Sequence, residues 1–212
     1  MSTIREIHFL RSIDNKNIVK LYDIVSPDGS ALFASITIVN LSLEYSKLNP
    51  ICMIMEYVEH DMWGFLQYTR DKKLALYVPS RSVMHRYSKD HVRWYMYQFL
   101  QALSYLHKNM IMHRDLKTSN LLLTNKHEIK LTDFGLARQL QFGDKNRYTT
   151  EVMTLWYRPP ELLLGKSEYS TETDVWSAGC IFGELLACGP LFPTHSDSKV
   201  SELARLHRRS KS

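Results

Sequence analysis

Cysteine is scarce in this sequence of 212 residues. Only Cys52, Cys180 and Cys188 occur, an odd number without metal-ligand spacing, so we expect free thiols in a reducing compartment rather than disulfides. Long apolar runs are absent too. Ala31–Leu43 is the longest, and Ser, Thr and Asn interrupt it well short of the roughly 20 residues of a membrane span. Met1–Ile13 alternates charged and apolar residues at helical spacing, so no signal peptide is expected.

The composition is that of an ordinary globular protein, with 44% hydrophobic and 23% charged residues. It allows one good-sized core or one and a half small domains. The formal net charge is +5, and part of the surplus lies in the last residues, Arg205–Ser212. This tail could be a nuclear-import or acidic-partner patch, but a solvated terminus is the favoured interpretation because chain ends are usually of that kind.

Hydrophobic periodicity predicts strands mainly before Ser88 and helices mainly after it. A long amphipathic helix capped by Ser88 is expected to bury one face, made of Val92, Tyr95, Met96, Phe99, Leu100, Leu103 and Leu106. Thr171–Asp174 has the form of a capping box and predicts the start of an apolar helix. The other expected elements are a helix over Ser2–Ile13, a strand over Asn17–Val25, a buried strand in Ile51–Val58, and two short strands within Asn120–Thr124 and Ile129–Thr132. Ser30–Asn49 is left unassigned, and Thr69–Tyr87 is predicted to be a loop.

Polar residues with complementary chemistry follow the long helix. Asp115 is expected in a loop between that helix and a hairpin, and Lys117 could neutralise a transferring phosphoryl group. The side-chain oxygens of Asn120 and Asp133 suit a hard cation such as Mg²⁺, and Gly135 is expected to let the backbone turn away. A base, a cation and two oxygen ligands favour phosphoryl transfer, which needs alignment and charge neutralisation more than a covalent nucleophile.

The motifs "HRDLKTSN", "DFG" and "PPE", in this order and spacing, resemble those of the eukaryotic protein kinases. "TIREI" and "TLWYRPPELLLG" are similar to segments of the cyclin-dependent kinases. "MEYVEHDMWGFL" and "GLARQ" resemble the transcription-linked branch that partners cyclins of the T or K type. The resemblance spans most of the chain apart from Ser30–Asn49 and Thr69–Tyr87, which look like insertions.

The resemblance implies an α+β, protein-kinase-like fold. Residues 1–60 would form part of the N-lobe and the hinge, namely the αC helix and the strands after it, with an insertion near 30–49. Residues 61–200 would form most of the helical C-lobe up to about the αG region, with an insertion near 69–87, and residues 201–212 would be a basic tail. The two insertions could be translated intron sequence or lineage-specific loops.

The same resemblance assigns roles to single residues. Asp115 would accept the proton of the substrate hydroxyl, Lys117 would contact the transferred phosphoryl group, and Asn120 with Asp133 would hold Mg²⁺. In the nucleotide site, Met55 would lie at the back of the pocket, and the backbone of Glu56, Tyr57 and Val58 would bind the adenine. Asp61 would lie near the ribose, Leu122 would form the floor, and Asp133 would lie at the phosphates. Glu6 would be the helix Glu that pairs with the phosphate-binding Lys.

A second set of residues would regulate the enzyme. Thr149 matches the activating phosphorylation site, and Thr150 is the less favoured target. Arg5, Arg114 and Arg138 match the three arginines that gather the phosphothreonine through charge-assisted bonds. Three unrelated surface arginines are the alternative, which the agreement of all three motif positions disfavours.

Two parts of the family pattern are missing from the 212 residues. No G-x-G-x-x-G occurs among the eight glycines, and no Lys-bearing strand precedes Glu6. The far end also stops early, so truncation at both ends is expected. Because loss of one preorganised electrostatic contact commonly costs ~10²–10³ in rate, this polypeptide is expected to be nearly inactive although its parent architecture is an active kinase.

The resemblance therefore implies an ATP- and Mg²⁺-dependent Ser/Thr kinase that acts before Pro, partners a cyclin, and resides in the nucleus and/or cytoplasm. Binding of nucleic acid or membrane is not expected. The alternative is a non-catalytic module that docks a cyclin through "TIREI" without phosphorylating anything. Small-molecule kinases are disfavoured by Thr149 and "TLWYRPPE", which serve peptide substrates.

Overall fold

The computed structural model describes residues 2–25, 52–71, 88–140, 147–150 and 152–193. Ser30–Asn49 and most of Thr69–Tyr87 lie outside these residues. The helices are α1 (Ser2–Ser12), α3 (Met62–Asp71), α4 (Lys89–Lys108), α5 (Pro160–Leu163) and α6 (Glu172–Ala187), with 3-10 turns η1 (Thr118–Asn120) and η2 (Leu155–Tyr157). The strands are β1 (Leu21–Val25), β2 (Cys52–Met55), β3 (His60–Asp61), β4 (Ile111–Met112), β5 (Leu121–Leu123), β6 (Ile129–Leu131) and β7 (Arg138–Gln139).

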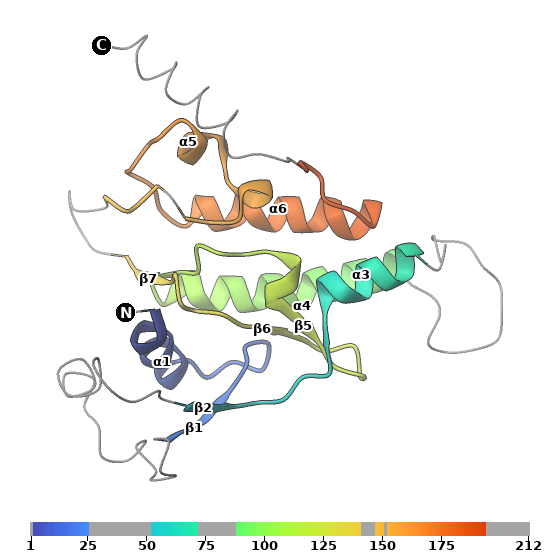
Figure 1. The fold of residues 1–212 in the computed structure, drawn as a ribbon, viewed down its shortest axis with the longest axis horizontal. Coiled ribbons are helices and arrows are strands. Elements are labelled where there is room, and N and C mark those ends of the chain that lie inside the picture. Colours follow the sequence, from blue (N-terminus) through green and yellow to red (C-terminus); the bar gives the residue numbers. More distant parts are fainter. Residues whose placement is uncertain (1, 26–51, 72–87, 141–146, 151, 194–212) are drawn as a thin grey trace.

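Helix α4 is the centre of the fold, with α6 on one side of it and the small strands with α1 on the other (Figure 1). Its predicted cap is present: the Ser88 hydroxyl accepts the His91 N–H at 3.4 Å, and His91 Nδ1 accepts the Ser88 N–H at 3.2 Å. The predicted apolar face is buried except at Leu100, which is 48% exposed. Leu100 lies at the border of the apolar stripe, so its inclusion in the buried face was wrong.

The two strands before α3 are shorter and more open than predicted. β1 begins at Leu21 rather than Asn17, because Asn17 and Val19 instead exchange backbone hydrogen bonds with Leu131 at 2.8 and 3.0 Å. β2 covers only Cys52–Met55 and alternates exposed with half-buried side chains. Within the described residues β2 pairs only with β1, so the prediction of a buried strand was wrong.

The predicted hairpin after η1 is confirmed. β5 pairs antiparallel with β6, and β3 adds a third strand through the pair Asp61 and Leu122. The hairpin rests on a single apolar cluster that extends from α1 through α4 to α6. The loop that carries Asp115, residues 113–117 (the catalytic loop), therefore lies between α4 and β4 on one side and η1 and β5 on the other.

Helices α3 and α6 correct two local predictions. α3 extends to Asp71, and the buried Thr69 hydroxyl donates to the Leu66 carbonyl at 2.8 Å, so the first residues of the predicted loop are helical. α6 begins as expected, but Thr171 makes no side-chain capping bond. Asp174, the acid of the predicted capping box, contacts the catalytic loop instead.

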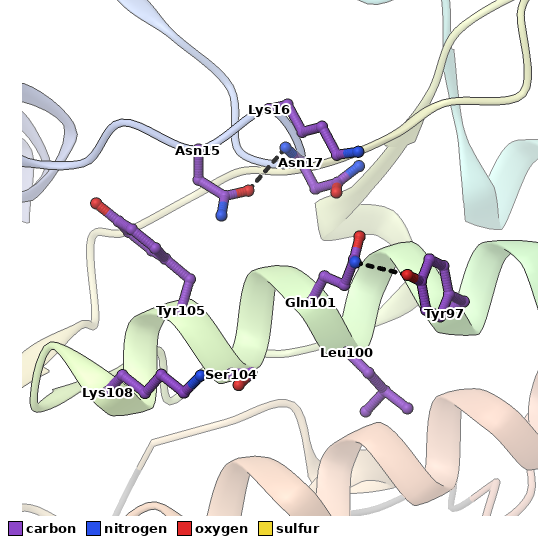
Figure 2. A pocket seen from close by; sticks show the side chains of 9 residues that line it. All are labelled: Asn15, Lys16, Asn17, Tyr97, Leu100, Gln101, Ser104, Tyr105 and Lys108. Carbon is purple, nitrogen blue, oxygen red and sulfur yellow. Dashed lines mark hydrogen bonds between the residues drawn. The ribbon is translucent and has the colours of Figure 1, made fainter.

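A groove of about 530 Å³ lies between α4 and the loop of residues 15–17 (Figure 2). A second, of about 560 Å³, lies between η2, α6 and Leu191–Pro193. Among the described helices, none is both long and apolar enough to cross a membrane.

Candidate active site

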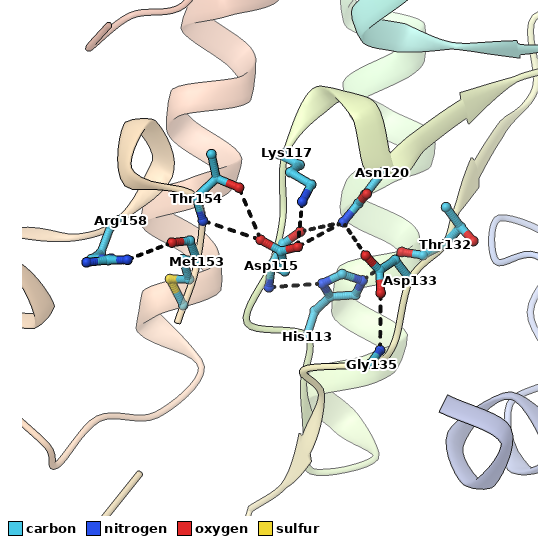
Figure 3. Close-up of polar contacts among 10 residues, drawn as sticks. All are labelled: His113, Asp115, Lys117, Asn120, Thr132, Asp133, Gly135, Met153, Thr154 and Arg158. Carbon is cyan, nitrogen blue, oxygen red and sulfur yellow. Dashed lines mark hydrogen bonds and ion pairs between the residues drawn. The ribbon is translucent and has the colours of Figure 1, made fainter. Parts of the chain in front are cut away.

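The predicted catalytic residues converge on Asp115 (Figure 3). Lys117 Nζ lies 2.7 Å from Asp115 Oδ2, and both side chains are largely buried. Asn120 Nδ2 donates to the Asp115 carbonyl at 2.9 Å and lies 3.4 Å from one carboxylate oxygen of both Asp115 and Asp133. Four residues spread over 19 positions of sequence thus share one polar centre.

His113 supports this centre from below. Its Nε2 donates to the Thr132 carbonyl at 3.0 Å, and its Nδ1 accepts the Asp115 N–H at 3.3 Å, a pattern that requires the Nε2–H tautomer. The side chain is fully buried and packs edge-on against Phe134, with ring centroids 4.9 Å apart. His113 therefore links the backbone of the Asp115 loop to that of the Asp133 segment.

Asp133 itself has the special backbone conformation of the "DFG" segment. The φ of Asp133 is 65°, whereas the φ of Gly135 is not positive. The chain does turn at Gly135, as expected: Gly135 and Leu136 are the central residues of a turn closed by the Ala137 N–H, which donates to the Phe134 carbonyl at 3.0 Å, but Gly135 makes this turn without a positive φ. Asp133 Oδ1 accepts the Gly135 N–H at 3.3 Å, and this short loop accommodates the left-handed conformation that Asp tolerates better than most residues.

Glu6 of α1 faces this centre. Burial, and then the nearby negative charge of Asp133, raise the pKa of the Glu6 carboxyl, while a hydrogen bond from the Phe134 backbone opposes the shift. Among the described residues Glu6 has no ion-pair partner, so the site presents an excess of negative charge that favours binding of a cation.

The three predicted phosphate-binding arginines come together. Arg114 is 1% exposed with φ 66°, and its side chain donates to the Leu136 carbonyl and the Tyr169 hydroxyl at 2.9 and 2.7 Å. Burial, followed by repulsion from Arg114, lowers the pKa of both Arg5 and Arg138. Arg114 Nη2 is buried without a hydrogen-bond partner in the described part of the chain, a donor suited to an anionic acceptor.

Thr149 lies beside this arginine cluster. Its carbonyl accepts a 2.7 Å hydrogen bond from the Tyr169 hydroxyl, the same hydroxyl that accepts from Arg114. Thr149 is exposed, whereas Thr150 is half-buried. The predicted phosphorylation site and the predicted pocket are therefore neighbours through Tyr169.

The predicted nucleotide residues form a separate group along the hinge. Glu56 is fixed by an ion pair with Lys130 at 2.7 Å and by a 2.8 Å bond from its N–H to the Lys20 carbonyl. Tyr57 is 84% exposed, and Met55 and Val58 are half-buried. No hydrogen bond of the described residues joins this group to Asp115, but the ion pair between Glu56 and Lys130 connects it to β6 of the hairpin that follows the Asp115 loop.

Asp61 and Leu122, assigned to the ribose and the pocket floor, face each other across β3 and β5. Asp61 Oδ1 accepts the Gly64 N–H at 2.7 Å and so begins α3. A Cβ at Gly64 would lie 2.9 Å from Asp61 Oδ2, so a larger residue there would displace the carboxylate.

Comparison with known proteins decides the family. Residues 1–211 match the model described as "Protein kinase domain". The chain belongs to the protein kinase family. The family and fold predicted from "HRDLKTSN", "DFG" and "PPE" are thereby confirmed.

The similar proteins are cyclin-dependent kinases. The chain is 42% identical to Cyclin-dependent kinase G-2 of Oryza sativa subsp. indica, over 98% of the chain and 24% of that protein. It is 39% identical to Cyclin-dependent kinase C-3 of Oryza sativa subsp. japonica, over 94% of the chain and 56% of that protein. A solved structure, that of the yeast RNA Pol II CTD kinase CTDK-1 complex, aligns with TM-score 0.72 and 34% identity over 95% of this chain and 55% of that chain. The chain thus spans about a quarter to about half of these relatives.

Several residues that position the kinase site were missed at the level of sequence. Asp174 is fully buried; Oδ2 accepts the His113 N–H and Oδ1 the Arg114 N–H, each at 2.9 Å, and His107 Nε2 lies 3.0 Å from Oδ2. The Thr154 N–H and hydroxyl lie 3.3 and 3.4 Å from Asp115 Oδ1. The only signal for Asp174 was an acid at the start of an apolar helix, which capping explained equally well.

A second buried carboxylate joins the catalytic loop to η2. Glu184 is fully buried and accepts the Tyr157 hydroxyl at 2.7 Å and the Thr118 hydroxyl at 3.2 Å. Burial raises the pKa of the Glu184 carboxyl, and the two hydroxyl bonds oppose that shift. This contact was also invisible in the sequence, because Glu184 lies in the middle of an apolar run.

Proposed function

We propose that this protein is an ATP- and Mg²⁺-dependent Ser/Thr kinase of the cyclin-dependent type. The observation that carries the proposal is the convergence of Lys117, Asn120 and Asp133 on Asp115. Phosphoryl transfer requires a positioned acceptor for the substrate proton and charge neutralisation around the phosphoryl group, and this cluster supplies both.

In the proposed mechanism Asp115 accepts the proton of the substrate hydroxyl. Thr154 and Asn120 restrict its carboxylate from two sides, and Lys117 neutralises charge within 2.7 Å of it. His113 holds the backbone of the loop, so the carboxylate is positioned before substrate arrives. Such preorganisation lowers the barrier because little reorganisation remains for the reaction itself.

The donor set fits Mg²⁺. Asn120 uses its amide nitrogen toward Asp115 and Asp133, which leaves its amide oxygen for a ligand, and the Asp133 carboxylate supplies a charged oxygen. Hard oxygen donors are what this cation prefers, and the carboxylates of Asp133 and Glu6 lie close enough to repel each other, which a bound cation would relieve. When bound, Mg²⁺ would neutralise charge on the ATP phosphates.

Selection of Ser or Thr before Pro is supported by the segment that leads to Thr154. Arg158 donates to the carbonyls of Val152 and Met153, each at 2.9 Å. Met153 has φ 69°. Because Arg158 already binds both carbonyls, they are less available to an N–H of the residue after the phosphoacceptor, and proline has no N–H to satisfy.

A cyclin of the T or K type is the proposed partner, with α1 as its docking element, and phosphorylation of exposed Thr149 is the proposed activating step. The arginine cluster supports the second point, because Arg114 Nη2 lacks a partner among the described residues and a phosphate would supply one. The proposed location is the nucleus and/or the cytoplasm.

Binding of a cyclin without turnover is the second candidate function for the 212-residue polypeptide by itself. It is favoured by the carboxyl of Glu6, which has no ion-pair partner among the described residues although it faces Asp133.

A radiolabelled-phosphate assay on the purified chain with an added T- or K-type cyclin tests both candidates. The kinase proposal expects transfer to a Ser-Pro peptide over a Ser-Ala peptide, and a loss of about 10²–10³ in rate in Asp115→Asn. Equal turnover by Asp115→Asn would contradict the assigned role of Asp115. Cyclin capture and Mg²⁺–ATP affinity are measured on the same preparation. The second candidate function is identified if the chain binds the cyclin but neither binds ATP nor transfers phosphate.

A further inference from the structure

The groove between α4 and residues 15–17 lies outside the kinase site and takes no part in the proposed function. Its walls are formed by Asn15, Lys16 and Asn17 on one side and by Tyr97, Leu100, Gln101, Ser104, Tyr105 and Lys108 of α4 on the other (Figure 2). At about 530 Å³ it is within the range of ligand-binding clefts. We propose that this groove binds an extended, acidic segment of a partner protein through an apolar anchor between carboxylates.

The charges of the groove select an acidic ligand. Lys16 and Lys108 are exposed, and neither forms an ion pair with a described residue. No acidic side chain belongs to the lining; Asp14 precedes the loop, and its N–H donates to the Tyr105 hydroxyl at 3.2 Å. Two cations without a carboxylate between them attract a ligand of opposite charge.

The end of the groove nearest the start of α4 supplies an apolar contact. Tyr97 and Leu100 are 56% and 48% exposed, large values for apolar side chains on a helix whose opposite face is buried in the core. Tyr97 is held by a 2.9 Å bond from Gln101 Nε2 to its hydroxyl and by stacking on Trp94, with ring centroids 6.0 Å apart. A side chain placed on this surface would meet groups that are already ordered, which lowers the entropic cost of binding.

The amides of the groove suit a peptide backbone. Asn17 is 3% exposed, and both bonds of its Nδ2, to Gln98 Oε1 and the Ile129 carbonyl, fix its orientation. Its Oδ1 is buried without a hydrogen-bond partner in the described part of the chain, so Asn17 orders this wall of the groove and does not offer an exposed acceptor. Asn15 uses its Oδ1 for the Asn17 N–H at 2.8 Å, so its Nδ2 remains a donor.

Geometry sets the length of the ligand. The eleven steps of α4 from Tyr97 to Lys108 span about 16 Å, which five or six residues of extended chain match. A single-stranded nucleic acid fits less well, since it needs a row of cations along its backbone and this groove has only Lys16 and Lys108 in its lining.

The test uses the full 212-residue chain and a fluorescein-labelled peptide of about ten residues, with two central leucines flanked by glutamates, read by fluorescence anisotropy. Lys16→Glu combined with Lys108→Glu should weaken binding about tenfold or more, since two attractions become repulsions. The matched control reverses Lys89 and Lys126, which are exposed but lie outside the groove, and should change affinity less than about twofold.

A peptide with serines in place of the leucines should also bind at least about tenfold more weakly, as should the Leu100→Asp chain, with melting temperatures confirming that every variant is folded. Equal losses in the two double variants would mean non-specific charge attraction and overturn the proposal. Competition of the peptide by an oligo-dT strand at lower concentration than by unlabelled peptide would overturn it in favour of nucleic acid.

Discussion

Asp174 offers the sharpest test of how the catalytic loop is positioned. It is fully buried at the start of α6, and its two oxygens accept the backbone N–H groups of His113 and Arg114, each at 2.9 Å. Arg114 has φ 66°, so the carboxylate holds the loop in a conformation that it would not adopt freely. Asp174→Asn keeps the shape of the side chain but replaces one acceptor by a donor.

The cost follows from the geometry. The amide oxygen can replace Oδ2, which serves His113 and faces His107, but the amide N–H₂ then faces the Arg114 N–H at the former Oδ1 position. One charged hydrogen bond is lost, and one buried N–H is left without an acceptor. Together these changes should lower the free energy of unfolding by about 2–4 kcal/mol. For a chain of this size that is a fall in melting temperature of about 5–15 °C.

Urea unfolding followed by circular dichroism measures the change, with Asp90→Asn as the matched control. Asp90 also lies in the first turn of a helix, but its side chain is 84% exposed, and its ion pair among the described residues is with the exposed Arg93. The control should therefore cost less than about 0.5 kcal/mol. If Asp174→Asn were as stable as the control, the buried carboxylate would not hold the loop and the reasoning would fail.

Three further variants test single contacts. Tyr157→Phe removes the hydroxyl that donates to Glu184 at 2.7 Å and should lower the free energy of unfolding by about 1–3 kcal/mol in the same assay; an unchanged value would contradict the buried bond. Thr154→Val keeps the backbone bond to Asp115 but removes the hydroxyl, so kcat/KM should fall about fivefold with melting unchanged. Burial, and then the neighbouring imidazole of His127, lower the pKa of His91 from its ordinary value of 6.5. Below that pH the unfolded chain therefore binds more protons at His91 than the folded chain does, so the folded state loses stability as the pH falls. The stability advantage of wild type over His91→Gln should accordingly shrink between about pH 8 and pH 5.5, and a constant difference would refute it.

The parts of the structure that the sequence predicted well are those with local causes. Ser88 caps α4 through atoms three residues away, and the hairpin of β5 and β6 is set by two short apolar runs with a polar turn between them. The contacts of Lys117 and Asn120 with Asp115 were also predictable, because the motif places these residues within five positions, while their catalytic roles stay predictions. In each of these cases the determining contacts lie within a few positions of each other.

The errors came from contacts that join distant positions. Asn17 left the predicted strand because its side chain reaches Gln98 and Ile129, 81 and 112 positions away. The nearly continuous apolar run around β2 predicted a buried strand, yet Ile54 is 46% exposed, because apolar character does not report how many layers cover a strand. The sequence pattern alone could show neither the distant partners of Asn17 nor the number of layers that cover β2.

The same limit explains why α6 looked like a simple apolar helix. Asp174, Ser177 and Glu184 fall within about 80° of one another at 100° per residue, and all three are fully buried. Asp174 binds the catalytic loop backbone, Ser177 donates to the Tyr157 carbonyl at 2.8 Å, and Glu184 accepts the Tyr157 hydroxyl. Buried polar groups are costly unless each finds a partner, so a polar stripe inside an apolar helix predicts a polar partner surface. In this fold that surface is the catalytic loop and η2, and α6 therefore acts as the support on which Asp115 is positioned.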